Sequence, residues 1–498
     1  MEIIASYVPR GAGDPRQELG GPPPGATMVE LRVDLLGSGV SLGGLVAASP
    51  LPVLLTLRSR AEGGAGPDGA GDRTAFFREA AASAAALIDV EAERDLGVLD
   101  GVVPRERAVL SIHGPAAPCH DLRERTARLL EAGTRLAKVA PQVRDLADLV
   151  AVLGLAQELD RGKRSQRRAV VLATGEVGRA ARLLGPLLAA PVAYVAWAAG
   201  RSAAEGQYTV EELLQHIGHL GGRPRRLFAV LGEHAAASWS PRMHNAAYRA
   251  LELPHLFVPL PVASAAELDA LLVPSGRGPL DAIGLGVGGY AVTMPWKEAA
   301  AARCDLVAPR AARAYAVNTV LPRPGKTIGD LTDIDGISRV VHEAGVDLTR
   351  ARAVILGTGG AARAAAVALN LAGATVGIVG RDAAKAAEVA ARLGVGACTL
   401  GETQHADVVV NAIPLGLDAA PDLLLDGVRA PAGALVVDLP YGEAPTRLAE
   451  LAAARGWSYV DGREVLLYQG VSQFAAMNGA APPVRAMAGA LGLEGAES

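Results

Sequence analysis

Lysine is scarce in this chain, and one of the few lysines lies in an apolar segment where an amine could react. Of the 48 basic residues only five are lysines. Since arginine serves wherever only a positive charge is needed, a lysine kept within Leu136–Ala140 carries more information than usual. Apolar neighbours favour a neutral amine, which can attack a carbonyl carbon and form an imine. Lys138 is therefore a candidate nucleophile, although its spacing is equally compatible with a strand-end lysine that reaches solvent.

Other polar side chains stand where apolar runs end. Glu30 and Arg32 close one run, Arg58 closes the next, and His113 closes a later one. A histidine beside an amine could act as a general base, and Arg32, Arg58 and Arg182 could bind a carboxylate. A histidine satisfied within the core is the competing interpretation for His113, but its pairing with Lys138 favours a catalytic role.

The second half carries another pair suited to proton transfer. Lys297 follows a short apolar run, and Asp333 lies 36 residues further on. A lysine and an aspartate brought together can relay a proton to a reacting carbonyl oxygen. Ser238 and Ser240 stand beside a predicted helix start. Taken alone, Lys297 and Asp333 are equally compatible with a surface ion pair. The two serines, taken alone, are better explained as helix caps.

The elements that position the first set of residues form a repeating pattern. Eight apolar runs alternate with segments of helical period, among them Thr74–Ala85, Asp121–Ala132 and Gln142–Leu159. The first connection, Gly11–Gly25, is expected to be a loop. Such a pattern predicts a parallel (β/α)8 barrel with its active site at the carboxyl ends of the strands. The runs are Ile3–Val8, Thr27–Val33, Pro52–Leu57, Ala86–Val90, Val109–His113, Arg135–Ala140, Ala169–Ala173 and Val192–Trp197.

A second α/β region follows a break at Gly221–Pro224, which itself follows a helical pattern at Val210–Leu220. In this region the strand Ala353–Leu356 leads into a glycine-rich turn and a helix, and a further strand is predicted at Thr375–Val379. This order is typical of a dinucleotide-binding unit, and a tight loop is the alternative. The predicted fold class is therefore α/β, with a barrel followed by a two-domain dehydrogenase that has a Rossmann-like nucleotide-binding domain.

Composition excludes several classes of protein. The charges nearly balance, with 48 basic against 52 acidic residues, so nothing favours binding to nucleic acid. No run of eighteen apolar residues predicts a membrane span. The three cysteines are far apart, which argues against a disulfide framework and a thiolate metal site. Because Met1-Glu2 has no basic leader after it, we expect no signal peptide and a cytoplasmic location. We also expect no bound metal.

Taken in order, the residues of the first half resemble type I 3-dehydroquinate dehydratases over about residues 1–220. The resemblance implies that Lys138 forms the imine, that His113 transfers protons and that Glu62 orients His113. It also implies that Arg182 binds the carboxylate of the substrate. By the same resemblance, Glu30, Arg58 and Gln207 would hold hydroxyl groups of the substrate, and Arg32 is expected among the substrate contacts. The matching segments are Glu30–Asp34, Thr56–Ser59 with Glu62–Gly64, Ser111–His113, Lys138, Gly175–Gly178 with Arg182, and Gly206-Gln207.

The lid segment departs from this family. Ala203-Ala204-Glu205 stands where the family has Ser-Ala-Pro, and Thr174 replaces the usual methionine. The missing hydroxyl and proline affect binding and loop closure, whereas the imine and proton-transfer residues are kept. We therefore expect weaker substrate affinity with turnover largely preserved.

The second half is similar to shikimate dehydrogenases over nearly all of residues 227–490. The resemblance implies that Lys297 and Asp333 form the catalytic pair while hydride moves between a nicotinamide and a cyclic ketone or alcohol. Three positions depart from the family pattern: Glu233-His234, Ala291 and Leu331. The residues expected to hold the substrate are Ser238, Ser240, Thr293, Asn318, Tyr441 and Gln469; the Asn411–Gly416 segment, Asp438 and Phe474 also match.

This resemblance implies NADP(H) as the cofactor. The second strand of the nucleotide unit ends in Gly380-Arg381-Asp382, and Arg381 falls where the family binds the 2′-phosphate. Asp382 replaces a threonine and is expected to soften the preference for NADP. The residues expected to contact the cofactor are Gly357, Gly359, Gly360, Ala361, Arg381, Asn411 and Gly462.

Together the two resemblances imply a bifunctional enzyme of the shikimate pathway, because the product of the first reaction is the substrate of the second and such fusions are known. The predicted domains are 1–222, 225–333 completed by 460–498, and 334–459. The expected partners are small molecules (3-dehydroquinate, 3-dehydroshikimate and shikimate), without nucleic acid or membrane. Three alternatives stay open: a dehydrogenase for quinate, a non-catalytic sensor of pathway metabolites, and a Schiff-base aldolase in the barrel.

Overall fold

The computed structural model describes residues 1–10, 14–36, 41–114, 117–161, 168–414 and 425–493. The chain divides into two compact units. The first comprises Met1–Arg226, Pro254–Val262 and Pro279–Leu285; the second comprises Leu227–Leu253, Ala263–Gly278 and Gly286–Ser498. In the described ranges, no helix has both the length and the apolar character needed to cross a bilayer.

Residues 1–222 contain the eight predicted strands, each with ends within two residues of the expected ones. All neighbouring strands are parallel, in the order β7-β6-β5-β4-β3-β2-β1-β8. The Ala190 N–H donates to the Ala169 carbonyl at 3.0 Å across the remaining seam, so the barrel is nearly closed. The strands are β1 (Glu2–Tyr7), β2 (Met28–Arg32), β3 (Val53–Thr56), β4 (Leu87–Glu91), β5 (Ala108–Gly114), β6 (Leu136–Pro141), β7 (Ala169–Val171) and β8 (Val192–Ala196).

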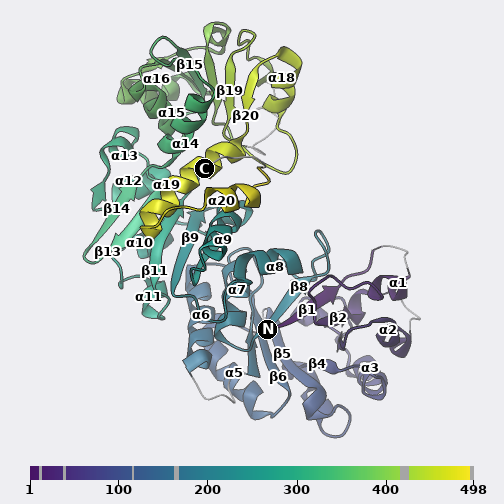
Figure 1. Cartoon of the computed structure of the whole chain (residues 1–498). Coiled ribbons are helices and arrows are strands. Elements are labelled where there is room, and N and C mark those ends of the chain that lie inside the picture. Colours follow the sequence, from purple (N-terminus) through teal and green to yellow (C-terminus); the bar gives the residue numbers. More distant parts are fainter. Residues whose placement is uncertain (11–13, 37–40, 115–116, 162–167, 415–424, 494–498) are drawn as a thin grey trace. The chain divides into compact units, whose positions relative to one another are not determined.

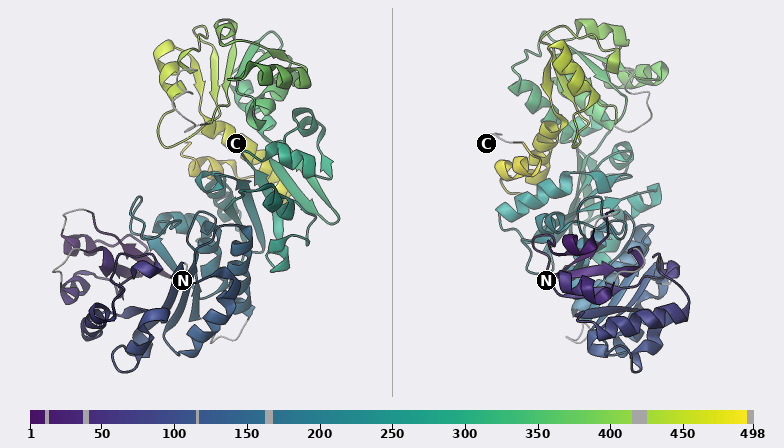
Figure 2. Two further views of the ribbon diagram at one scale, coloured as in Figure 1. Left: turned by 180° about the vertical axis from the view of Figure 1, so that it is seen from behind. Right: turned by 90° about the vertical axis from the view of Figure 1, so that its right-hand side faces the viewer.

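Helices surround these strands (Figure 1, Figure 2). The expected loop Gly11–Gly25 is wrong in part, because it contains the short helix α1 (Pro15–Leu19). Asp14 accepts a hydrogen bond from the Arg16 N–H, and proline occupies the first turn, where its missing N–H does no harm. The other helices are α2 (Leu42–Ala48), α3 (Ala70–Ala82), α4 (Ala92–Asp95), α5 (Leu122–Glu131), α6 (Leu146–Arg161), α7 (Arg179–Leu188) and α8 (Val210–Ile217).

The barrel interior changes from apolar to polar over two residues in every strand except β7, where the later residue is Leu172, just beyond the strand end. One buried cluster takes an apolar side chain from every strand: Ile4, Met28, Leu54, Leu87, Val109, Leu136, Val170 and Val192. Because side chains alternate across a strand, the residue two positions later faces the same side. Those residues are Ser6, Glu30, Thr56, Asp89, Ser111, Lys138, Leu172 and Tyr194. The strand period therefore gathers polar groups toward the carboxyl ends, directly above an apolar floor.

The chain from Arg226 onward builds two further sheets. The first has the order β10-β9-β11-β13-β14-β12, and the second is fully parallel with the order β17-β16-β15-β18-β19-β20. The strands are β9 (Arg226–Gly232), β10 (His255–Pro261), β11 (Val287–Val292), β12 (Leu306–Val307), β13 (Thr319–Arg323), β14 (Lys326–Asp330), β15 (Arg352–Leu356), β16 (Thr375–Val379), β17 (Gly396–Ala397), β18 (Val408–Asn411), β19 (Leu435–Asp438) and β20 (Ser458–Val460).

The parallel sheet has helices on both faces, with α15 and α16 on one side and α18 on the other (Figure 1). Its chain order reverses between β15 and β18, which is where such sheets bind ligands. The described helices of this half are α9 (Ser240–Ala250), α10 (Ala265–Leu271), α11 (Pro279–Ala282), α12 (Lys297–Arg303), α13 (Pro309–Ala314), α14 (Asp333–Glu343), α15 (Gly360–Leu371), α16 (Ala383–Leu393), α18 (Arg447–Arg455), α19 (Gly462–Asn478) and α20 (Val484–Ala490).

Helices α14 and α19 approach closely, and this contact positions the second site. A Cβ at Gly336 would lie 2.6 Å from the Val465 carbonyl oxygen, so only glycine fits there. The close packing brings Asp333, at the start of α14, beside Gln469 on α19, in the wall of one pocket.

Candidate active sites

The structure brings all eight barrel residues singled out from the sequence into one pocket at the carboxyl ends of the strands. They come from strands that are far apart in the chain and from the segments that follow them. They are Glu30, Arg32, Arg58, Glu62, His113, Lys138, Arg182 and Gln207.

Lys138 is buried, so the interpretation as a lysine that reaches solvent is wrong. Its side chain is 5% exposed, and its Nζ lies 3.3 Å from Asp89 Oδ2 and 3.7 Å from Glu30 Oε1. The ring of Tyr194 lies 4.0 Å away. The apolar neighbours in the sequence are therefore an incomplete guide, because the amine itself meets two carboxylates and an aromatic face. This arrangement holds the lysine in place and offers groups that can take its proton.

His113 points one ring nitrogen at a carboxylate and leaves the other for a substrate. Its Nδ1 lies 2.9 Å from Glu62 Oε2, and when Glu62 is ionised the Nδ1–H donates to this carboxylate. Burial, together with the nearby positive charges of Arg58 and Lys138, holds the pKa of His113 well below its usual value. Burial also raises the pKa of Glu62 to about 8, against the opposing effect of Arg58. The imidazole is thus neutral and can accept a proton.

Arg182 is the arginine of this pocket with the fewest protein partners. It is buried, its Nε has no hydrogen-bond partner in the described part of the chain, and one of its terminal nitrogens donates to the Glu205 carbonyl at 3.3 Å. Burial lowers its pKa to about 10, so it is still a cation at neutral pH. Arg32 is instead held by Asp34, at 2.7 and 2.8 Å. Arg182 is therefore the group best placed to bind a carboxylate.

Gln207 organises the lid segment. Its Oε1 accepts from the Ala203 and Ala204 N–H groups at 2.8 and 3.3 Å, and its Nε2 donates to Ser6 Oγ at 3.3 Å. Ala203, Ala204 and Glu205 all line the pocket. The segment that departs from the family pattern therefore forms one wall of the site.

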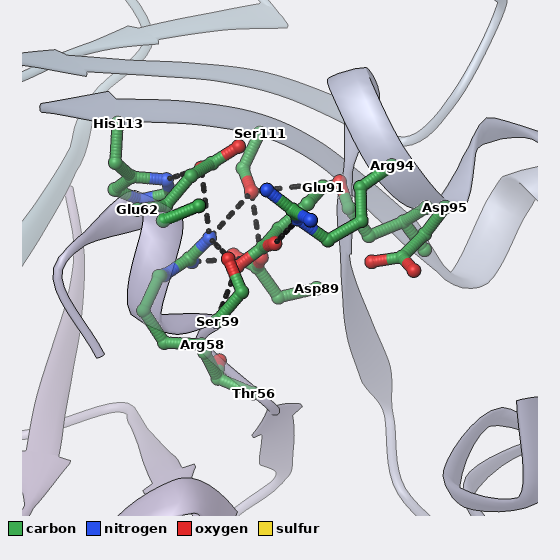
Figure 3. Close-up of polar contacts among 12 residues, drawn as sticks. Thr56, Arg58, Ser59, Glu62, Asp89, Glu91, Arg94, Asp95, Ser111 and His113 are labelled. Atoms are coloured by element: carbon green, nitrogen blue, oxygen red, sulfur yellow. Dashed lines mark hydrogen bonds and ion pairs between the residues drawn. The ribbon is translucent and has the colours of Figure 1, made fainter. Parts of the chain in front are cut away.

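Three polar residues of this site were missed in the sequence. Asp89 and Glu91 lie on β4 and Ser111 lies on β5, and all three contact Arg58 (Figure 3). Arg58 donates to Asp89 at 2.8 Å, to Glu91 at 3.0 Å and to Glu62 at 3.3 Å. Acidic residues at alternate positions of an apolar strand were the available signal. Arg58 is consequently committed to protein carboxylates.

The second pocket gathers Lys297 and Asp333 at the starts of α12 and α14. Lys297 Nζ lies 2.5 Å from Asp333 Oδ2, and each side chain is 15% exposed. The interpretation as a surface ion pair is therefore wrong. All six residues expected to hold the substrate line the same pocket: Ser238, Ser240, Thr293, Asn318, Tyr441 and Gln469.

Buried amides fix the far wall of this pocket. The Asn318 Nδ2 group donates to Thr332 Oγ1 at 3.0 Å and to Gln469 Oε1 at 3.3 Å. Gln473, which the sequence did not single out, donates to the Asn318 carbonyl at 3.1 Å and contacts His244 at 3.2 Å. Nothing in the local pattern marks Gln473, because its partners lie more than 150 residues away.

The turn after β15 fits a pyrophosphate. Gly357 has a φ of 120°, and Gly359 caps α15 without any side-chain hydrogen bond, which leaves the first N–H groups of the helix for an anion. A Cβ at Gly360 would lie 3.0 Å from Lys297 Cβ, and Ala361 lines the substrate pocket. The turn therefore lies against the catalytic lysine.

The other residues expected at the cofactor are placed differently. Arg381 is exposed just after β16, whereas Asp382 caps α16 by accepting from the Ala384 and Lys385 N–H groups. Asn411 donates to Asp438 Oδ1 at 2.8 Å and accepts from the Ile413 N–H, so it shapes the loop after β18. Gly462 lines the substrate pocket, where a Cβ would meet three carbonyl oxygens at 2.4–2.7 Å. Leu415 and Gly416 of the matching segment lie outside the described residues.

Comparison with known proteins matches different family models to the chain up to residue 223 and from residue 230 onward. Residues 22–223 match the family model described as type I 3-dehydroquinase. Residues 230–320 match the shikimate dehydrogenase substrate binding domain, and residues 352–442 match a model described as NADP oxidoreductase, coenzyme F420-dependent.

Individual relatives match either one half or nearly the whole chain. A shikimate dehydrogenase (NADP(+)) of Halobacterium salinarum is 37% identical over 275 residues, which is 53% of this chain and 98% of the relative. A bifunctional 3-dehydroquinate dehydratase/shikimate dehydrogenase of Arabidopsis thaliana is 28% identical over 490 residues, covering 92% of this chain and 79% of the relative. A solved shikimate 5-dehydrogenase of Thermus thermophilus is 34% identical, with coverages of 53% and 98% and a TM-score of 0.47.

Proposed function

Because the chain belongs to the shikimate dehydrogenase family and carries a type I 3-dehydroquinase domain ahead of it, we propose that it catalyses two consecutive reactions. The barrel removes water from 3-dehydroquinate, and the second half reduces the resulting 3-dehydroshikimate to shikimate with NADPH. The observation that carries this proposal is the presence of two complete pockets, one with Lys138 and His113 and one with Lys297 and Asp333.

In the barrel, Lys138 attacks the ketone carbon, and loss of water gives an imine. The amine must first lose a proton, and Asp89 and Glu30 lie within reach of it. His113 then takes the proton from the carbon next to the imine and returns it to the departing hydroxyl group. Hydrolysis of the imine releases the product and restores the lysine.

The other barrel residues orient the substrate. Arg182 pairs with the carboxylate as a charge-assisted hydrogen bond, while Glu30 and Gln207 hold hydroxyl groups. Arg58 positions the catalytic carboxylates and does not bind the substrate itself, because its nitrogens already contact Asp89, Glu91 and Glu62. Glu62 keeps the His113 ring in the tautomer with a free Nε2.

In the second half, bound NADPH supplies a hydride to the ketone carbon. Lys297 and Asp333 hold a proton at the carbonyl oxygen, which becomes the new hydroxyl. The hydroxyls of Ser238, Ser240 and Tyr441 hold the carboxylate, and Asn318 and Gln469 hold the ring hydroxyls. Thr293 completes the wall beside Lys297.

The preference for NADP over NAD is part of this proposal. Arg381 is exposed at the end of the second strand of the nucleotide domain, where it can pair with a 2′-phosphate. Asp382 Oδ1 accepts from two N–H groups in the first turn of α16. This supports a weaker repulsion between the Asp382 carboxylate and the 2′-phosphate than the sequence predicts. The division into 1–222, 225–333 with 460–498, and 334–459, the cytoplasmic location and the absence of nucleic-acid partners also belong to the proposal.

The test is to supply 3-dehydroquinate and NADPH to the purified chain. Shikimate should accumulate while NADPH is consumed, and neither should happen when 3-dehydroquinate is omitted. Formation of 3-dehydroshikimate without NADPH consumption would contradict the second reaction, and absence of both products would contradict the first. Parallel oxidation of shikimate and quinate identifies the preferred alcohol.

A further inference from the structure

One fully buried arginine of the barrel has no role in the reaction as proposed. Arg73 lies on α3 and is 1% exposed. Its Nε donates to Asp95 Oδ1 at 2.8 Å, and one terminal nitrogen donates to the Pro67 carbonyl at 3.1 Å. The other terminal nitrogen donates to Asp95 Oδ2 and also lies 3.1 Å from Glu91 Oε2. Removing a guanidinium from water is unfavourable unless it compensates buried negative charge, and here one guanidinium faces two buried carboxylates, Asp95 and Glu91.

Glu91 joins Arg73 to the active site, because its two oxygens face opposite ways. Oε2 faces outward, 3.1 Å from Arg73 and 3.2 Å from Arg94. Oε1 faces inward and accepts from Arg58 at 3.0 Å and from the Ser59 N–H at 2.8 Å. One carboxylate is thus shared between the outer arginines Arg73 and Arg94 and the inner Arg58; Figure 3 labels Glu91 with Arg94 and Arg58.

Arg58 has to serve both catalytic side chains at once. It donates to Glu62, the partner of His113, and to Asp89, the partner of Lys138. The weaker of these contacts is the one to Glu62, at 3.3 Å against 2.8 Å for Asp89. A stronger electrostatic attraction between Glu91 and Arg58 would therefore lengthen the contact of Arg58 with Glu62 first.

We propose that Arg73 is a positioning residue for the dehydration: by compensating Glu91 from outside the barrel, it lets Arg58 stay in contact with Glu62 and so keeps Glu62 against His113. This inference rests on the proposed function of the barrel. Without the Arg73 guanidinium, Arg94 is the outer cation left at Glu91 Oε2 among the contacts described, and the less compensated charge of Glu91 draws Arg58 away from Glu62. The Glu62 carboxylate then loses its cation while Asp89 and Glu91 still face it, which favours its protonated form.

The first test replaces Arg73 in the whole chain. In Arg73→Met, kcat for dehydration should fall about tenfold to hundredfold, a part of the roughly 10²–10⁴ that a positioned general base supplies, with little change in KM. The ascending part of its pH profile should move to higher pH. Borohydride trapping of 3-dehydroquinate on Lys138 should persist, because Lys138 contacts Asp89 and Glu30. Arg73→Lys should recover much of the rate, since it keeps a cation near Glu91.

Arg107 provides the matched control. It also lies outside the strands, but it donates only to the carbonyls of Ala81, Ser83 and Ala85 in the contacts described. Arg107→Met should leave kcat and the pH profile unchanged.

A double-mutant cycle with Glu91→Gln separates positioning from folding. If Arg73 acts through Glu91, its replacement should matter less once Glu91 is neutral, whichever of Arg73→Met and Arg73→Lys yields folded protein. Equal losses in both backgrounds, or a loss of imine trapping in step with kcat, would overturn the proposal. An unmodified chain that does not dehydrate 3-dehydroquinate would instead overturn the proposed function.

Discussion

Replacing Lys138 tests the chemistry and the packing of the barrel together. In Lys138→Ala no amine is left to form an imine, so dehydration should be lost while the dehydrogenase half stays active. The change also removes the cation that lies 3.3 Å from Asp89 and 3.7 Å from Glu30, where all three side chains are at most 5% exposed. Breaking a buried ion pair by removing one partner costs about 3–5 kcal/mol, which sets the expected loss in the free energy of unfolding of the barrel.

Lys138→Arg separates the two effects. Arginine keeps a positive charge beside both carboxylates, but its guanidinium stays protonated and forms no imine. This variant should lose dehydration yet retain most of the stability. Stability is measured by urea denaturation, with unfolding of the barrel followed by the peptides that a protease releases from it. The imine is detected by borohydride trapping with 3-dehydroquinate and mass spectrometry. Dehydration by either variant, or a trapped adduct on a peptide without Lys138, would refute the assignment.

Three further predictions concern pH, cofactor and lid. Burial raises the pKa of Glu62 from 4.5 to about 8, so the folded barrel binds this proton more tightly than the unfolded chain does; that stability is complete below pH 4.5 and is lost as the pH rises through 8. Glu62→Gln should therefore flatten the fall in urea midpoint between pH 5 and pH 8, and an unchanged slope would contradict the cause. Arg381→Ala should raise KM for NADPH about tenfold to hundredfold, for the roughly 1.5–3 kcal/mol of a charged hydrogen bond, with little change for NADH; equal effects on both would count against a 2′-phosphate site. Ala203→Ser combined with Glu205→Pro should lower KM for 3-dehydroquinate by about tenfold or less, since one hydrogen bond contributes about 0.5–1.5 kcal/mol; a higher KM would mean that the present lid grips the substrate in another way.

The eight strands of the barrel were predictable because each is a short apolar run, local in the sequence, between segments of helical period, and side chains on a strand then alternate with a period of two. The same period placed Lys138 and His113 on one face, since Ser111 pairs with Lys138 in the parallel register and His113 lies two residues further on. The partners of these residues were harder to predict. Asp89 and Glu91 were not predicted, because only closure of the barrel brings them to Arg58.

In the second half, two residues have roles that differ from the prediction or were not predicted, one through a long-range contact and one through a local helix cap. Gln473 lies one helical turn beyond Gln469, and nothing nearby predicts that it holds the Asn318 carbonyl. Asp382 was interpreted through the cofactor, whereas its position before α16 makes it a helix cap. Tertiary structure selects the partners of Gln473, whereas Asp382 pairs locally with N–H groups two and three residues further along the chain.

The closeness of Gly360 to Lys297 has a consequence for engineering. An added methyl group at Gly360 would press on the aliphatic chain of Lys297, at 3.0 Å from its Cβ and Cδ. Attempts to exchange cofactor preference by grafting a foreign turn would therefore disturb proton delivery as a side effect. Redesign confined to Gly380–Asp382, where the side chains nearest to a Cβ at Gly380 would be Thr358 and Ala386 and not Lys297, leaves that lysine untouched, which makes this segment the better place to alter cofactor preference.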